Sequence, residues 1–444
     1  MYKLRWILSK ISYHALYSFL NIPIMSQSAN SKTTVLFASL AGTTIEFFDF
    51  YIYANAAILV FPHLFFPEST PATQMLQSLA TFAVAFFARP LGSAFFGHYG
   101  DKIGRKATLV AALLTMGLST LMIGFLPSYH SVGIIAPMLL VLCRFGQGFG
   151  LGGEWGGAVL LAVENAPQGQ RAWYGMFPQL GAPLGLLMSG GIFLYLTETL
   201  PGEDFLNFGW RIPFIASSIL IALGLYVRLK ITETPEFTQA SKTENLQQNI
   251  PMNKLFKSQK KSLLLATFTG VATFGIFYLM TVFIAGWSIQ HFKLTEDDFL
   301  ILQLYSIFFF AIMIPISAVI ADKFSASKMM IFSSLLITIF GLFLEYFMNI
   351  DGFGVLITLC LGMTLMGLTY GPLGTLLSSM FPITVRYTGA SLSFNLAGIL
   401  GASFAPFIAM WLANNYGFNF VGYYLSVMGF ISMIAAYFGQ TRKI

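Results

Sequence analysis

The chain has 444 residues, of which 9% are charged and 56% hydrophobic, and its mean hydropathy is +0.73. A soluble globular domain carries about 25% charged residues, so this composition excludes that class. The formal net charge of +6 would suggest a nucleic-acid partner in a soluble protein, but the positions of the basic residues explain it here, and we expect no such partner.

Residues 1–32 precede the first hydrophobic stretch, and we expect them to form a cytoplasmic extension. Lys3, Arg5 and Lys10 stand there among apolar residues at helical spacing, which suggests a helix on the membrane surface. The alternative is an upstream start codon, with Met25 opening the functional protein. A signal peptide is disfavoured because Lys10 and His14 interrupt the apolar region.

Twelve hydrophobic stretches follow, each long enough to cross a bilayer as a helix of roughly 20 residues. They predict an all-α membrane protein with twelve transmembrane helices. The expected spans are residues 33–60, 76–97, 106–126, 134–163, 171–196, 210–229, 261–289, 299–321, 328–347, 354–380, 388–412 and 419–439.

The basic residues predict the orientation of these spans. With both termini in the cytoplasm, all but four of the 24 Lys and Arg residues are cytoplasmic. Arg89 and Arg144 fall within spans, and Arg211 and Lys293 lie outside. The positive-inside rule therefore favours a multi-pass protein of a cytoplasmic membrane with both ends inside.

A polar stretch at residues 230–260 divides the spans into two sets of six, and we interpret it as a cytoplasmic linker. It separates bundles at residues 33–229 and 261–440, and residues 441–444 form a cytoplasmic tail. Arg386 follows Arg171 by 215 residues, and Asp322 follows Asp101 by 221, each at a matching point of its half. These offsets predict an internal duplication with a substrate site where the halves meet.

The residues that usually carry catalysis or bind metals form no recognisable constellation. Cys143 and Cys360 fall in spans of opposite halves, and the five histidines are scattered, so we expect no enzyme, metal site or cofactor. The fourth span contains seven glycines between residues 146 and 157. Their small-x-x-x-small spacing predicts close helix packing, whereas a nucleotide-binding loop would need a preceding strand.

Several motifs carry a resemblance to a known family. GHYGDKIGRK at 97–106, with a partial copy in ADKFSASK at 321–328, resembles the signature of the major facilitator superfamily. TTIEFFDFYIYA (43–54), RPLG (89–92), RFGQGFGLGGEWGGA (144–158) and MFPITVRYTGAS (380–391) are similar to its metabolite:proton symporter family. Members carry shikimate, 2-oxoglutarate, citrate, or proline and betaine. The resemblance implies the major facilitator fold and a proton-coupled importer in a bacterial inner membrane.

The resemblance also implies an ion cluster at the cytoplasmic ends of the spans that acts as an inner gate. The expected members are Asp101, Arg105, Lys106, Glu164, Arg171, Asp322 and Arg386. Family members often have an acidic residue before the Phe-Pro that follows span ten, where this chain has Ser379 and Met380. We therefore expect the gate to rest mainly on the first half. The alternative role for Lys102, Arg105 and Lys106 is membrane topology alone.

Five ionisable residues lie clearly within spans, where each costs roughly 2.5–3.5 kcal/mol and needs an explanation. They are Glu46, Asp49, Arg89, Arg144 and Glu154. Glu46, Asp49 and Tyr53 follow i, i+3, i+7 spacing, which places them on one helical face toward the expected cavity. Counting rise per residue brings Glu46 and Arg144 to similar depth, so we expect that they can pair.

These residues suggest how protons and substrate are coupled. Our hypothesis is that Asp49, or secondly Glu46, carries the proton, while Arg144 pairs with that carboxylate or with an anionic substrate group. Substrate capture by Arg144 would then free the carboxylate, which prefers the protonated form in a low dielectric. A fixed ion pair that only orients the helices is the alternative. The expected substrate-binding residues are Arg144, Gln147, Tyr53, Arg89, Tyr278 and Tyr370.

The function predicted is secondary active transport: proton-coupled symport of a small organic acid or zwitterion. Gly181, Pro183 and Gly185 loosely resemble an antiporter motif, so an exchanger or exporter is one alternative, and a transport-dead metabolite sensor is another. The expected partners are a small-molecule substrate, protons and the lipid bilayer, and we expect a monomer.

Overall fold

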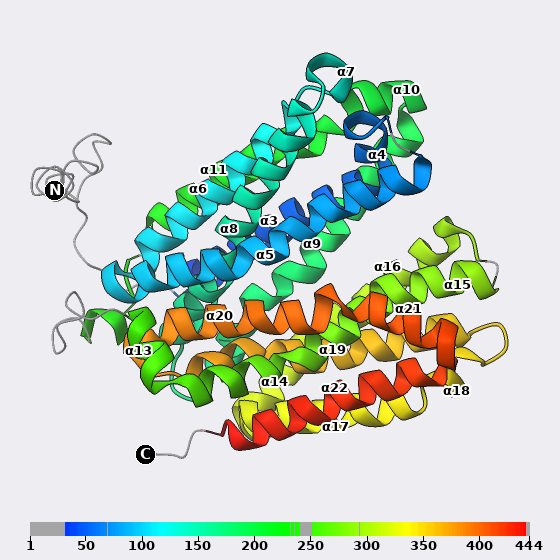
Figure 1. Cartoon of the computed structure of the whole chain (residues 1–444). Helices are drawn as coiled ribbons and strands as arrows, with labels where there is room; N and C mark the ends of the chain where they lie inside the picture. The colour runs from blue at the N-terminus through cyan, green and yellow to red at the C-terminus, as the bar shows by residue number, and fades with distance from the viewer. Residues whose placement is uncertain are drawn as a thin grey trace, which may run out of the picture.

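The computed structural model describes residues 32–68, 70–230, 232–234, 236–239, 251–292 and 294–440, in which all regular structure is helical (Figure 1). Eleven helices among these residues are long and apolar enough to cross a membrane, and Ala326–Leu342 is a shorter apolar helix. Each of the twelve predicted spans coincides with one of them. The expected surface helix, the Met25 start and the tail at 441–444 lie outside the described residues.

The first half contains six long helices: α3 (Lys32–Leu59), α5 (Pro71–Ile103), α6 (Arg105–Gly124), α8 (Ile135–Glu164), α9 (Arg171–Thr199) and α11 (Arg211–Lys230). Within it α3 packs on α9, and α8 packs on α5 and α6. The short helices α4 (Phe61–Phe65), α7 (Tyr129–Val132) and α10 (Gly202–Asp204), with the π-helical η1 (Phe205–Gly209), lie at one end of this half.

The second half contains α16 (Glu296–Lys323), α17 (Ala326–Leu342), α19 (Gly354–Ser379) and α22 (Asn419–Phe438) as single helices, with α18 (Leu344–Met348) following α17. Its other two spans are interrupted by π-helical segments, which the hydrophobic pattern of the sequence did not predict. α14 (Lys260–Tyr278) passes through the π-helical η3 (Leu279–Phe283) into α15 (Ile284–Phe292). Likewise α20 (Arg386–Gly398) passes through η5 (Ile399–Ser403) into α21 (Ala405–Tyr416).

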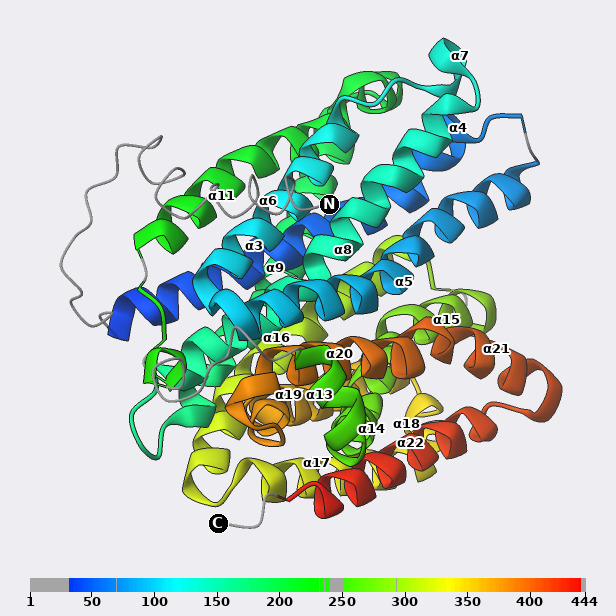
Figure 2. The same ribbon diagram turned by 60° about the vertical axis from the view of Figure 1, so that its left-hand side comes forward.

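The two halves lie side by side as separate groups of helices in both ribbon views (Figures 1 and 2). Between them α5 packs on α20 and α9 packs on α16, which are equivalent pairings under the duplication. The ends carrying α7 and α10 in one half and α15 and α18 in the other diverge in Figure 1. We call these the outer end, and the opposite end, which carries α13 (Pro251–Ser258), the inner end.

Glycine permits close helix contact both within the first half and between the halves. A Cβ on Gly148 of α8 would lie 2.6 Å from the Cα of Ala85 in α5. A Cβ on Gly97 of α5 would lie 2.6 Å from the Cα of Thr388 in α20. The predicted close packing of the fourth span is confirmed by Gly148, and Gly97 of the second span brings the inner parts of the halves close together.

Candidate functional site

A cavity lies between the two halves, lined by α3, α5, α8 and α9 on one side and α14, α16, α19 and α20 on the other. Glu46 and Arg89 are the charged residues of its lining, and Asn395 adds an amide. Most of the remaining lining is aromatic: Phe47, Phe50, Tyr51, Phe274, Phe277, Tyr278, Phe310, Tyr370 and Phe394. A concave, largely apolar site with few polar groups is typical of small-molecule binding.

A layer of interlocked side chains closes the cavity toward the inner end. Trp155 of α8 stacks on Phe394 of α20 with ring centroids 3.6 Å apart, which joins the two halves face to face. The Trp155 indole donates to the Gln179 side-chain oxygen at 2.7 Å, and the Gln179 amide donates to the Tyr370 carbonyl at 2.7 Å. We call this layer the floor.

Asp49 lies behind the cavity, inside the first half. It is fully buried, accepts a hydrogen bond from the Ser217 hydroxyl of α11 at 2.5 Å, and also interacts with Thr120 of α6. Its Oδ2 has no hydrogen-bond partner, and no ion pair to Asp49 exists among the described residues. Of the two predicted carboxylates, Glu46 therefore lines the cavity and Asp49 does not.

Arg144 is also inside the first half, and its predicted pairing with Glu46 is wrong for this conformation. Its guanidinium donates to Gln147 at 3.0 Å, and Gln147 donates to Thr120 at 2.7 Å. Thr120 thus connects the surroundings of Arg144 to Asp49. The cation lies over the Tyr53 ring, with Cζ 3.9 Å from the centroid, and its Nε and Nη2 are buried without hydrogen-bond partners in the described part of the chain.

The predicted substrate-binding residues therefore divide into two groups. Arg89, Tyr278 and Tyr370 line the cavity. Arg144, Gln147 and Tyr53 are fully buried behind it, where the Tyr53 hydroxyl donates to Thr81 at 2.6 Å. Helical spacing placed Glu46, Asp49 and Tyr53 on one broad face, but it did not show that neighbouring helices α5, α6 and α11 would cover part of that face.

Arg228 is a buried charge that sequence reasoning missed, because it lies near the end of its span and was counted with the cytoplasmic residues. It pairs with Glu154, and both side chains are buried. Its guanidinium also donates to the Leu109 carbonyl at 3.1 Å. The pair ties α11 to α8 and gives the charge on Glu154 a structural partner. A lone carboxylate in the fourth span was the signal that such a partner was needed.

Two aspartates at the inner end each cap a helix of the other half. Asp101 of α5 accepts from the backbone N–H groups of Tyr387 and Thr388, both at 2.9 Å, where α20 begins. Asp322 of α16 accepts from those of Ala172 and Trp173, both at 2.8 Å, where α9 begins. The offsets of 221 between the aspartates and 215 between the capped residues repeat the spacing in the sequence. Carboxylates stabilise helix N-termini because they satisfy free N–H groups and oppose the helix dipole.

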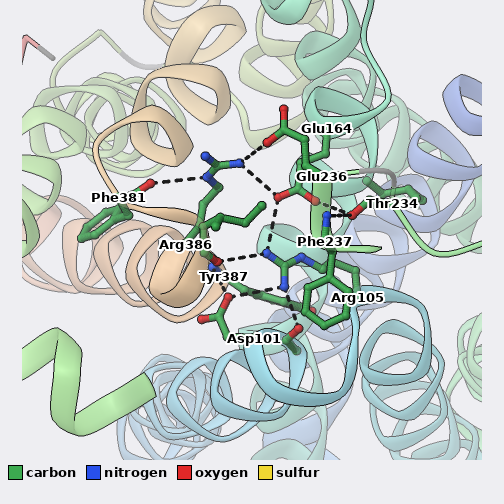
Figure 3. A network of polar contacts seen from close by, with 12 residues as sticks. Asp101, Arg105, Glu164, Thr234, Glu236, Phe237, Phe381, Arg386 and Tyr387 are labelled. Carbon is green, nitrogen blue, oxygen red and sulfur yellow. Dashed lines mark hydrogen bonds and ion pairs between the residues drawn. The ribbon is translucent and has the colours of Figure 1, made fainter. Parts of the chain in front are cut away.

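An ion cluster surrounds the first of these caps (Figure 3). Arg105 contacts Asp101 at 3.6 Å and Glu164 at 3.4 Å, and all three side chains are fully buried. Glu164 also pairs with Arg386 of the second half at 3.3 Å. The ion pairs are thus concentrated around the first copy, while Asp322 of the second half contributes a cap without such a cluster.

The segment that follows α11 completes the cluster and was not predicted to take part. Glu236 pairs with Arg171 at 2.5 Å and with Arg386 at 2.6 Å, so it bridges the two halves. Nearby, the Thr234 hydroxyl donates to Glu164 at 2.6 Å, and Arg105 lies over the Phe237 ring. Figure 3 shows these side chains converging on Arg105 and Glu164. Acidic residues directly after the sixth span, in a chain poor in charge, were the available signal.

Two predicted gate residues have other contacts than expected. Arg171 reaches the cluster only through Glu236, and its side chain is half exposed. Lys106 donates to the Leu229 carbonyl at 2.8 Å, and its backbone N–H donates to Glu233 at 3.2 Å. These contacts hold α6 against the end of α11 within the first half, so Lys106 does not join the halves.

The comparisons with known proteins agree on one family. The model of the Major Facilitator Superfamily matches residues 39–398. The inner membrane metabolite transport protein YhjE of Escherichia coli K12 is 52% identical over 412 residues, covering 91% of this chain and 93% of the relative. The shikimate transporter of the same organism is 34% identical, covering 90% and 92%, and the proline/betaine transporter of Salmonella typhimurium is 32% identical, covering 89% and 81%.

Among solved structures, the proton:xylose symporter XylE bound to 6-bromo-6-deoxy-D-glucose superposes with a TM-score of 0.74. The match covers 91% of this chain and 94% of that one at 16% identity, which supports the shared fold.

Proposed function

This chain belongs to the major facilitator superfamily and is a membrane transporter rather than an enzyme, and from that premise we propose that it imports a small organic acid or zwitterion together with protons. The cavity between the halves is the proposed substrate site. The conformation described here is closed at its inner end, and we propose that this end faces the cytoplasm, as the basic residues predict.

The observation that carries the proposal is the unpaired carboxylate of Asp49. An ionised carboxylate inside a membrane protein is costly without a counter-ion, and binding a proton removes that cost. Among the described residues Asp49 is bonded only to hydroxyl groups, while the cation nearest in the same polar network, Arg144, is held two side chains away by Thr120 and Gln147. We propose that Asp49 takes up the proton and that this network responds to occupancy of the cavity.

The inner gate supports transport by alternating access. The caps made by Asp101 and Asp322 exist only while the inner ends of the halves touch. We propose that the halves rock apart at this end, which opens the cavity to the cytoplasm and releases substrate and proton.

The test is uptake of labelled organic acids and zwitterions into proteoliposomes that contain the purified chain, with and without an imposed inward proton gradient. Accumulation that needs the gradient supports symport. Counterflow without proton movement would indicate an exchanger, and failure to transport any substrate of a broad panel would contradict the proposal.

A further inference from the structure

The cavity contains one carboxylate and one guanidinium that do not pair with each other. Glu46 interacts electrostatically with Arg89 across this space and also with Arg228 of α11, yet none of the ion pairs among the described residues includes Glu46 or Arg89. A carboxylate and a guanidinium held apart in a low-dielectric site are each left without a close partner, so the charge on Glu46, like that on Asp49, is unfavourable unless a proton or a cation binds to it. A ligand that carries both charges would satisfy them together.

Arg89 is positioned to receive the anionic group. Its Cζ lies 4.5 Å from the centroid of the Phe50 ring and 5.2 Å from that of Phe86, and its Nε is buried with no hydrogen-bond partner among the residues that the structure describes. The rings fix the plane of the guanidinium by cation–π contact and compete for none of its N–H groups. A planar guanidinium with free N–H groups matches a carboxylate in two-point geometry.

Glu46 is positioned to receive the cationic group. The residue is 3% exposed, and its Oε2 is buried with no hydrogen-bond partner within the described ranges. The surrounding lining includes the rings of Phe47, Tyr51 and Tyr370. A carboxylate surrounded by aromatic faces is the usual environment for an ammonium group, including a methylated one that donates no hydrogen bonds.

Three tyrosines add groups that can adapt to the ligand. Within the described residues, the hydroxyls of Tyr51, Tyr278 and Tyr370 make no hydrogen bond to another side chain or to the backbone, although all three line the cavity. They supply hydroxyl donors and acceptors close to both charges, so a bound molecule can be desolvated without losing its polar contacts.

We infer that the cavity binds a small zwitterion, with its ammonium group between Glu46 and the aromatic rings and its carboxylate on Arg89. This inference rests on the proposed transport function and narrows its substrate to one charge class. A monoanion would satisfy Arg89 and leave Glu46 facing its carboxylate, whereas a monocation would leave Arg89 unpaired.

The experiment compares three molecules of nearly the same shape on the purified full-length chain. Glycine betaine carries both charges, 3,3-dimethylbutanoate lacks the cation, and choline lacks the carboxylate. Competition by each against uptake of labelled glycine betaine, L-proline and L-carnitine is measured in proteoliposomes. We expect a zwitterion to be taken up and the two single-charge molecules to compete at least ten-fold more weakly.

Two variants separate this assignment from a general loss of activity. Glu46→Gln should weaken zwitterion binding at least ten-fold and should strengthen binding of 3,3-dimethylbutanoate, because the repulsion of its carboxylate is removed. Glu345 is an exposed carboxylate of α18 at the outer end, and Glu345→Gln should change the binding of neither the zwitterion nor the monoanion. A role of Glu46 in folding alone would not raise affinity for the monoanion.

The outcomes distinguish this inference from the proposed function. Proton-driven uptake of organic anions, with no zwitterion transported, would overturn the zwitterion assignment and leave symport standing. Protein that transports neither class would overturn both. Equal weakening of the zwitterion and the monoanion by Glu46→Gln would also overturn the assignment of Glu46 to the cation.

Discussion

Asp101 and Asp322 stand at equivalent positions of the two halves, and each places both carboxylate oxygens on the first backbone N–H groups of a helix in the opposite half. The contacts are reciprocal: α5 caps α20, and α16 caps α9. Because both caps join the halves at the inner end, separating the halves there breaks all four of these hydrogen bonds.

The first prediction concerns this pair of caps. Asp101→Asn should shift the protein about ten-fold toward the inward-open state, because hydrogen bonds to a charged acceptor contribute roughly 1.5–3 kcal/mol and the amide retains one acceptor oxygen. The measurement is labelling of Ser391→Cys in a Cys143→Ser, Cys360→Ser background. Ser391 is fully buried opposite Gly156 of the other half, so a maleimide reaches it when the inner end opens. Asp351→Asn, at an exposed outer turn, is the control, and unchanged labelling in Asp101→Asn would refute the gate.

The second prediction concerns Glu236, which bridges Arg171 and Arg386. Glu236→Gln should raise the same labelling by less than about five-fold, because this bridge is partly exposed and such ion pairs contribute roughly 0.2–1 kcal/mol. High salt on the inner side should reduce the difference between Glu236→Gln and the unaltered chain. An effect as large as that of Asp101→Asn would mean that the bridge, and not the helix cap, dominates the closure.

The third prediction concerns Asp49. Asp49→Asn should abolish proton-driven accumulation while retaining substrate counterflow, because the amide keeps the hydrogen bond with Ser217 but cannot exchange a proton. Ser217→Ala is the matched variant: it removes the hydroxyl and keeps the carboxylate, so coupling should survive in altered form. Concentrative, proton-dependent uptake by Asp49→Asn would exclude this residue as the carrier.

The fourth prediction concerns stability. Glu154→Gln should destabilise the protein by about 3–5 kcal/mol, because Arg228 would be left as a buried cation without the carboxylate that it pairs with. Adding Arg228→Met should restore much of the lost stability, since the unpaired charge is then removed. Thermal unfolding in detergent measures both effects, with Glu198→Gln at an exposed position as the control. A double variant less stable than Glu154→Gln would argue against this account.

The fifth prediction follows from the charge of the cargo. A zwitterion that enters with one proton carries one net positive charge, and 100 mV then contributes about 2.3 kcal/mol, or roughly fifty-fold accumulation. A potassium diffusion potential set with valinomycin should therefore drive uptake at equal pH on both sides. A monoanion entering with one proton is electroneutral and should not respond, so an absent response to voltage would contradict electrogenic zwitterion transport.

Much of the fold could be predicted from the sequence, because twelve apolar stretches and two matching offsets leave few arrangements. The offset between Asp101 and Asp322 even indicated their equivalent roles. The parts that could not be predicted depend on tertiary packing. The spacing of Glu46, Asp49 and Tyr53 gave a shared face, but the coverage of Asp49 by α11 comes from how the helices cross.

The role of Glu236 was hidden for a different reason. The stretch between the two sets of spans was interpreted as a linker because it is polar, and polarity does not distinguish a connecting segment from one that docks. Its contacts with Arg171 and Arg386 join residues that are 65 and 150 positions away in the chain, respectively. Charge scarcity elsewhere in the chain makes such acidic residues informative.

The floor formed by Trp155 and Phe394 lies between the cavity and the capped helix ends, so the path below the substrate has two barriers in series. A brief loosening of the helix caps leaves the stacked rings in place, and a shift of the rings leaves the caps in place. Neither fluctuation alone makes a continuous water column through the membrane. A carrier built this way can change shape many times without short-circuiting the ion gradients across its membrane.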